Sequence, residues 1–212
     1  MRHLLLAATL ILSAAPLCAR AADDGLERLS PPEAGLAVAA ARAGLARFLR
    51  LVPAAQTASY GFANRAEIDR ARLAAPYRVV TADEKGESLV ATEEWRFPIA
   101  VDGRYRALLT VAMMDGQLKA VNLGATGLAT ELAQLEKDRA VAPAARRLLL
   151  RLFSLRADFV SFPASTQSLD QAPFTPLASA RAQPGSAPDG QSAAKLLPWV
   201  HERRRALPPT TR

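Results

Sequence analysis

Two Asp-Gly pairs between Trp95 and Gly124 constrain the fold of this chain more than any other feature. Asp102-Gly103 and Asp115-Gly116 each lie between apolar runs, and this dipeptide favours a two-residue hairpin turn because both central residues of a type I′ turn need a positive φ. Before the first pair, apolar residues fall on every second position, which is the period of a half-buried strand: Trp95, Phe97, Ile99 and Val101. We therefore expect three antiparallel strands that form a meander.

The first hairpin contains a conflict of register. A two-residue turn places Ile99 on the same face as Arg106, whereas a slip of one residue pairs Phe97 with Leu109 and makes that face apolar. Pro98 has no N–H to donate to a neighbouring strand, so we expect a bulge or a sheet edge at this proline. The second hairpin contains no such conflict.

A long helix is predicted before the meander. The sequence Ser30-Pro31-Pro32-Glu33 is typical of a helix start, because serine and glutamate can cap the free amides and proline suits the first turn. The helix should run from Pro31 to Val52 and stop before Pro53. Its apolar residues recur at three- and four-residue spacing and form one stripe that packs on the sheet: Val38, Ala41, Leu45, Phe48, Leu49 and Val52.

The remaining elements complete one α+β domain over residues 30–162, with an antiparallel meander sheet of five or six strands packed against the long N-terminal helix. Asn64 followed by Glu67 predicts a short helix to about Leu73. Strands are expected at 77–82 and 88–92, a helix at 126–138 and a returning strand at 150–162. For residues 144–162, a helix remains the alternative to this strand.

The C-terminal region, residues 163–212, is predicted to be a flexible, low-complexity basic tail. Its composition is dominated by Pro, Ser, Ala, Gln and Gly, and residues 183–192 contain almost no large apolar side chain. A brief helix bearing Trp199 is expected at 193–205. On this interpretation, deletion of residues 183–212 should leave the thermal unfolding transition almost unchanged.

The first 21 residues have the pattern of a secretory signal peptide. A basic start precedes an apolar run from Leu4 to Leu12, and Ala19-Arg20-Ala21 offers small residues for cleavage before Ala22. The apolar run is too short for a permanent membrane anchor. We expect a periplasmic or secreted protein with a short leader at 22–29, and the alternative is a lipoprotein processed at Cys18.

Cleavage at this position limits the available chemistry. The only cysteine and one of the two histidines are removed, which leaves His201, so neither a Ser-His-Asp triad nor a Cys/His metal site is expected. Glu93-Glu94 offers two carboxylates, but adjacent strand residues point to opposite faces. No cofactor is predicted, and a hydrolase that uses carboxylates alone is the least favoured function.

Charge is distributed unevenly along the chain. Residues 22–140 contain 15 basic and 16 acidic residues, whereas residues 141–212 contain 10 basic and 4 acidic residues. The basic excess therefore belongs to the C-terminal third, where an anionic envelope surface would be its partner in an exported protein, and nucleic acid is not expected. This region supports a second functional hypothesis, a peripheral envelope-binding protein.

The leading hypothesis is a non-catalytic interaction module that binds an unknown protein or peptide. If Pro98 marks an edge, the strand from Trp95 to Val101 offers a template for strand addition. Arg96, Arg104 and Arg106 flank this strand and would favour an acidic ligand. The alternative is that these arginines form a solvated face that protects the edge.

The helix and the meander together resemble known secreted modules. The residues that carry the resemblance are the strand from Trp95 to Val101, the turns at Asp102-Gly103 and Asp115-Gly116, and the apolar run at 108–111. Their order is similar to that of uncharacterised secreted bacterial proteins and of PepSY-like or cystatin-like modules. The resemblance covers about residues 33–160 and implies an α+β module that binds or inhibits a partner, often a peptidase.

Overall fold

The computed structural model describes residues 31–185 and 187–206. The predicted signal peptide, Cys18, the leader and the capping Ser30 lie outside these ranges. The helices are α1 (Gly35–Leu51), α2 (Arg65–Asp69), α3 (Thr126–Asp138), α4 (Ala178–Arg181) and α5 (Ala193–Ala206), with 3-10 turns at Pro32–Ala34, Ala54–Tyr60, Phe153–Leu155 and Leu169–Gln171. The strands are β1 (Arg72–Leu73), β2 (Tyr77–Ala82), β3 (Leu89–Val101), β4 (Arg104–Met114), β5 (Gln117–Gly124), β6 (Leu148–Leu152), β7 (Ala157–Ser161) and β8 (Thr175–Pro176).

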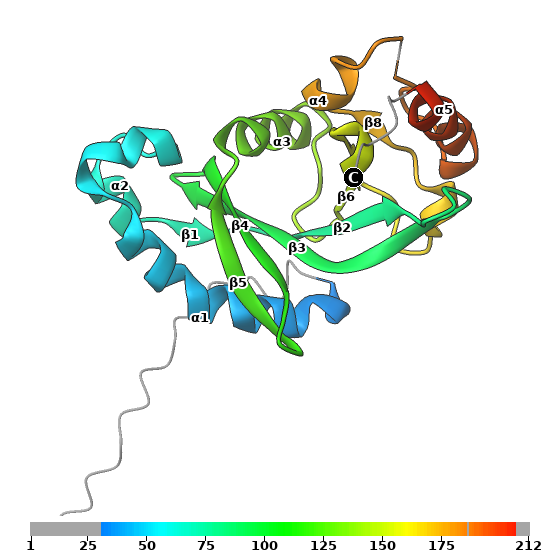
Figure 1. Ribbon diagram of the computed structural model, residues 1–212. Coiled ribbons are helices and arrows are strands. Elements are labelled where there is room, and N and C mark those ends of the chain that lie inside the picture. Colours follow the sequence, from blue (N-terminus) through cyan, green and yellow to red (C-terminus); the bar gives the residue numbers. More distant parts are fainter. Residues whose placement is uncertain (1–30, 186, 207–212) are drawn as a thin grey trace, which may run out of the picture.

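All eight strands belong to one open, twisted sheet (Figure 1). The strand order is β5-β4-β3-β2-β6-β7-β8, and β1 pairs with β3 beside the end of β2. The pairing of β2 with β6 is parallel, and the other described pairs are antiparallel. The predicted α+β class and the helix-covered antiparallel meander are confirmed.

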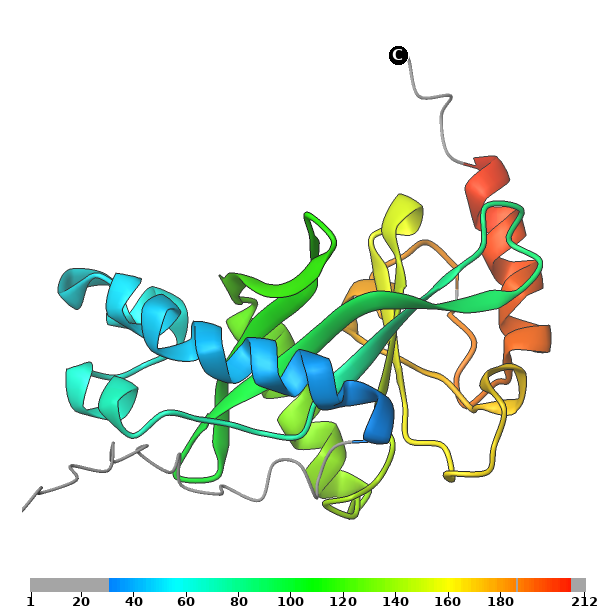
Figure 2. The same ribbon diagram turned by 90° about the horizontal axis from the view of Figure 1, so that it is seen from below.

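Helices cover both faces of the sheet. Figure 1 shows α1 below the sheet and α3 above it, and Figure 2 shows α1 crossing the meander. The core has three clusters: one joins α1 to β3, β4 and β5, another joins α5 to β2, β6 and β7, and the last lies beneath α3. Within residues 31–185 and 187–206, no helix is both long and apolar enough to cross a membrane.

The contact between α1 and β5 is close because Gly44 has no side chain. A Cβ placed on Gly44 would lie 2.3 Å from the Cβ of Ala120 in β5. The predicted apolar stripe of this helix does face the sheet, with Val38 and Ala41 fully buried. The helix ends at Leu51, immediately before the extended Val52 and Pro53, as expected from the position of the proline.

The structure resolves the register conflict of the first hairpin with a bulge. Val101 pairs with Arg104 at the turn, but Phe97 pairs with Leu109, so both of the expected registers occur in the same hairpin. The shift between them leaves Arg106 as the extra residue in β4. The bulge therefore lets Phe97 stay buried while Arg106 leaves the apolar face.

Two strand predictions require correction. The expected strand at 88–92 and the strand that begins at Trp95 form a single strand, β3. The expected strand at 150–162 is a hairpin, in which β6 and β7 are joined by the 3-10 turn Phe153–Leu155. Arg156 adopts a left-handed conformation there (φ 51°), which allows the chain to reverse direction. The alternation of apolar and polar residues had instead suggested one continuous strand.

The short helix after residue 64 also differs from its prediction. The Asn64 side chain accepts a hydrogen bond from the Glu67 N–H at 3.0 Å, so the predicted cap is present. However, α2 ends at Asp69, and the chain then forms β1, which pairs Leu73 with Ile99. The pairing with β3 therefore replaces the last turn of the predicted helix.

The predicted domain boundary at residue 162 is wrong. The region that was expected to be a flexible tail adds β8, α4 and α5 to the fold, and its residues 207–212 lie outside the described ranges. Phe174, Leu196 and Val200 are fully buried and pack against β6 and β7. These apolar residues are widely spaced, and short segments of Pro, Ser and Gly separate them. The composition of the region therefore did not indicate that it belongs to the core.

Candidate functional site

A groove on the surface lies between the N-terminal half of α1 and the β4–β5 hairpin. Its volume is about 650 Å³, and β3 forms the floor through Trp95. The two walls carry exposed apolar side chains: Leu36 of α1 is 78% exposed and Met113 of β4 is 42% exposed. Three alanines of α1 make the helical wall smooth: Ala39, Ala40 and Ala43.

The floor of the groove is a stacked pair. The guanidinium carbon of Arg78 lies 4.8 Å from the centre of the Trp95 ring, and the two residues pair across β2 and β3. The Arg78 Nε also donates a hydrogen bond to the Thr92 carbonyl oxygen at 3.0 Å. Trp95 is only 2% exposed, so it belongs to the core, although it also lines the groove.

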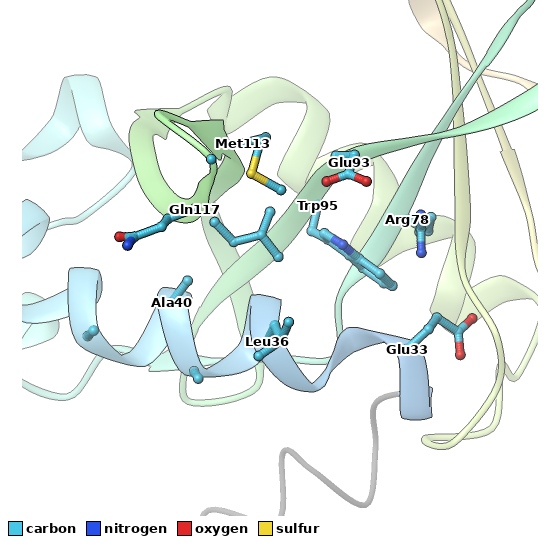
Figure 3. A pocket seen from close by; sticks show the side chains of 12 residues that line it. Glu33, Leu36, Ala40, Arg78, Glu93, Trp95, Met113 and Gln117 are labelled. Carbon is cyan, nitrogen blue, oxygen red and sulfur yellow. The ribbon is translucent and has the colours of Figure 1, made fainter.

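One end of the groove is charged, and the other carries apolar side chains with the uncharged Gln117 at its margin (Figure 3). Glu33, Arg78 and Glu93 lie around Trp95 at one end. Leu36 and Met113 lie toward the other end. Both glutamates are exposed, so a bound molecule can reach their carboxylates.

The structure does not place the predicted site residues on one open edge. The strand from Trp95 to Val101 lies inside the sheet, with β4 on one side and β1 and β2 on the other. The Pro98 carbonyl oxygen accepts a hydrogen bond from the Ala74 N–H at 2.8 Å, so the side of Pro98 that has no N–H faces the short gap between β1 and β2. Strand addition at Pro98 is therefore excluded.

Arg96 is a buried residue rather than a surface cation. It is 9% exposed, its Nη2 lies 2.6 Å from the Glu94 Oε1, and its Nη1 donates to the Thr110 hydroxyl. Burial lowers the pKa of Arg96, and the Glu94 carboxylate opposes this effect. Its charge is thus neutralised inside the fold and is not available to an acidic ligand.

Arg104 and Arg106 have different surroundings. Arg104 is exposed beside the first hairpin turn, whereas Arg106, the residue at the β4 bulge, forms an ion pair with Glu67 of α2. Both line a hollow of about 490 Å³ that also includes Tyr105 and Lys137. This hollow is distinct from the groove, and Arg104 and Lys137 are its exposed cations among the described residues.

The exposed edge of the meander is β5, and it is protected. Met114 and Gln117 flank the two-residue turn and form a hydrogen-bonded pair. From Gln117 onward, the backbone N–H and C=O groups of successive β5 residues point alternately toward β4 and away from it, so those of Ala120 point away from β4. The Arg47 Nη2 donates to the Ala120 carbonyl oxygen at 3.1 Å, and a bulge at Val121 follows. An arginine cap and a bulge are two means by which proteins prevent unwanted strand pairing.

The adjacent carboxylates of Glu93 and Glu94 serve different faces of the sheet. Glu93 lines the groove with Trp95, whereas Glu94 pairs with Arg96 on the opposite face. The expectation that strand geometry separates them is therefore confirmed. These two residues do not form the paired carboxylates that a glycosidase needs.

Glu136 of α3 accepts hydrogen bonds from three different side chains. Its Oε1 accepts from the Tyr77 hydroxyl and from the Arg147 Nε at 3.0 Å, and its Oε2 accepts from the Tyr105 hydroxyl at 3.2 Å and the Arg147 Nη2 at 3.1 Å. Burial, followed by the charge of Glu136, raises the pKa values of both tyrosines. Because both oxygens already have partners, this network is best understood as a connection between α3 and the sheet.

Sequence reasoning missed the residues of the groove. Two signals were present: Leu36 lies off the apolar stripe of its helix, and Met113-Met114 places two large apolar residues in succession beside a turn. Both features leave apolar surface that the core does not bury. Their proximity depends on the packing of α1 against β5, which local patterns do not specify.

No protein-family model, curated protein or solved structure matches the chain. The resemblance to PepSY-like or cystatin-like modules therefore stays a prediction. Among the described residues, no group of three or more His, Cys, Asp or Glu side chains is arranged to hold a metal ion.

Proposed function

We propose that this protein is a non-catalytic interaction module whose groove between α1 and the β4–β5 hairpin holds a peptide segment of a partner protein. The main support is the apolar surface on both walls, where Leu36 and Met113 remain exposed above the Trp95 floor. The whole groove has a volume of about 650 Å³, which is large enough for one or two side chains of an extended peptide. Methionine adapts its shape to different apolar ligands, which suits a recognition surface.

A binding role fits the groove better than catalysis by carboxylates. A general acid needs a carboxyl group that burial keeps protonated near neutral pH. Glu33 and Glu93 are exposed to solvent, and Arg78 lies between them at the same end of the groove. We therefore retain the carboxylate-only hydrolase only as a less favoured alternative.

The proposed place of action is the periplasm or the exterior of the cell. The support is the sequence of residues 1–21, with its basic start, apolar run and cleavage site before Ala22. Processing at Cys18 would instead attach the protein to a membrane. Mass measurement of the mature protein distinguishes a chain that starts at Ala22 from a lipid-modified chain that starts at Cys18.

Site-specific crosslinking tests the interaction function. A photo-crosslinking amino acid replaces Leu36 in the groove or, as the control, Leu51 at the opposite end of the same helix, which is 66% exposed. The proposal predicts that position 36 attaches to one defined segment of a partner in the cell envelope and that position 51 does not. Equal attachment from both positions, or none from position 36, would contradict the proposal.

A second candidate function is peripheral binding to an anionic envelope surface, and one observation favours it. Phe153, in the turn between β6 and β7, is 58% exposed, with the guanidinium carbon of Arg151 5.7 Å from its ring centre. Arg204 of α5 donates a hydrogen bond to the Ser154 hydroxyl at 3.3 Å, which brings the basic end of α5 to this turn. An exposed aromatic side chain beside arginines suits the interface of an anionic bilayer.

The charge around Phe153 makes this function the second choice. Arg204 also lies beside Gly86 in the turn between β2 and β3, which carries Asp83, Glu84 and Glu87. These carboxylates offset much of the positive charge. Pelleting with vesicles of phosphatidylglycerol tests the function: a Phe153→Ser variant should bind less than the parent protein, and equal binding would exclude Phe153 as the contact.

A further inference from the structure

We propose that the peptide segment in the groove carries a basic side chain next to its apolar anchor, and that this basic side chain contacts the exposed carboxylates of Glu33 and Glu93. The proposal rests on the interaction function of the same groove and specifies the chemistry of its ligand. It follows from the division of the groove into an apolar half and a charged half (Figure 3).

The apolar half provides the site for the anchor. Leu36 and Met113 lie on opposite walls of this half (Figure 3), and the half-buried Leu118 of β5 also lines the groove. The alanines of α1 leave space for a side chain of the size of leucine, methionine or phenylalanine. Burial of such a side chain supplies most of the binding energy.

The charged half has an excess of negative charge. Glu33 and Glu93 are both exposed, and Arg78 is the cation that lines the groove with them. Part of the hydrogen-bonding capacity of Arg78 is already used, because its Nε donates to the Thr92 carbonyl oxygen and its guanidinium lies over Trp95. Within residues 31–185 and 187–206, no ion pair joins Arg78 to either glutamate.

The neighbouring charges do not change this balance. At the hairpin tip, the Lys119 Nζ lies 3.2 Å from the Asp115 Oδ2, so this pair is neutral. Arg146 lies in an adjacent hollow on the other side of Glu33, and its Nη1 donates to the Gln167 carbonyl oxygen at 3.1 Å. Arg146 does not line the groove, so the lining of its charged end holds two carboxylates and one cation.

A lysine or arginine side chain fits both halves of such a groove. Its methylene stem can lie along the apolar wall while its charged end reaches the two carboxylates. An acidic side chain would instead meet two like charges at short range. The geometry therefore favours a partner segment in which a basic residue is the neighbour of the apolar anchor, and it disfavours an acidic residue at that position.

A peptide array tests this inference. The chain from residue 22 onward is applied to immobilised, end-blocked hexapeptides in which a central leucine, methionine or phenylalanine is followed by lysine, glutamine or glutamate. Alanine at the central position provides the control for the anchor. We expect the lysine peptides to bind about fivefold more tightly than the glutamine peptides, and the glutamate peptides to bind most weakly.

The variant Glu33→Gln/Glu93→Gln should remove the preference for lysine and retain the preference for an apolar anchor. Asp115→Asn is the matched control, because it neutralises an exposed carboxylate at the hairpin tip and should leave both preferences unchanged. If apolar anchors bind without regard to the following charge, this inference is overturned and the interaction function stands. If central alanine binds as well as the apolar anchors, the interaction function itself fails.

Discussion

Arg78 and Trp95 face each other across β2 and β3, and the Arg78 guanidinium carbon lies 4.8 Å from the centre of the indole ring. This stacked pair forms the floor of the groove, so the pairing of two interior strands determines its position. A cation over a tryptophan ring contributes about 0.5 to 2 kcal/mol, and more when water is excluded. The walls, by contrast, come from α1 and a hairpin tip, and their separation depends on the contact between α1 and β5.

Gly44 should be the residue most sensitive to added volume in that contact. Gly44→Ala places a methyl group 2.3 Å from the Cβ of Ala120, and we expect it to lower the free energy of unfolding by about 1 to 3 kcal/mol. Gly35→Ala is the matched control, because its Cβ meets no atom within 4 Å and alanine favours helix by up to about 1 kcal/mol. Chemical denaturation of both variants measures the difference. Equal stability of the two variants would contradict the close packing.

Charge reversal should reduce stability much more at Arg106 than at Arg104, the other arginine of the first hairpin. Arg106→Glu places a second carboxylate beside Glu67, which is 8% exposed, and should cost about 2 to 4 kcal/mol of stability. Arg104→Glu changes an exposed residue and should stay within about 0.5 kcal/mol. Thermal unfolding of the two single variants tests this difference. A stable Arg106→Glu protein would show that the ion pair with Glu67 has little importance.

Residues beyond 162 should contribute to global stability. Leu196 of α5 is fully buried against β6 and β7, so Leu196→Ala should lower the free energy of unfolding by about 2 to 5 kcal/mol. The exposed neighbour Lys195 provides the control, and Lys195→Ala should have an effect within about 0.5 kcal/mol. Deletion of residues 183–212 should therefore destabilise the domain, contrary to the expectation from composition. An unchanged melting temperature for the deletion would restore the tail interpretation.

These elements also show how far the sequence determines the fold. The meander was predictable because the strands and turns that specify it, such as Asp102-Gly103, are local in the sequence. The fold of residues 163–206 was not, because Phe174 and Leu196 are isolated apolar residues whose burial depends on strands far away in the sequence. The predicted sheet edge at Pro98 is absent for the same reason, because β1, some 25 residues earlier in the chain, pairs with that side of β3.

The tyrosines around Glu136 should make stability depend on pH in alkaline solution. Burial raises the pKa of Tyr77 well above its ordinary value of 10.0, and it also raises the pKa of Tyr105. The unfolded chain releases these protons near pH 10 while the folded protein retains them, so the free energy of unfolding should fall as pH rises above about 10. Urea denaturation between pH 8 and pH 11 measures the slope. The Tyr77→Phe/Tyr105→Phe variant should show a smaller slope, and an unchanged slope would assign the effect to other groups.

The most direct test of the interaction function compares two adjacent methionines. Met113 lines the groove, whereas Met114 is 48% exposed and, as the next residue in β4, points to the opposite face of the sheet. The measurement is the affinity of each glutamate variant for the partner segment identified by crosslinking at position 36. Met113→Glu should weaken binding at least tenfold, because a charge enters the apolar half of the groove, and Met114→Glu should leave the affinity unchanged. Equal affinities for the two variants would contradict binding in this groove.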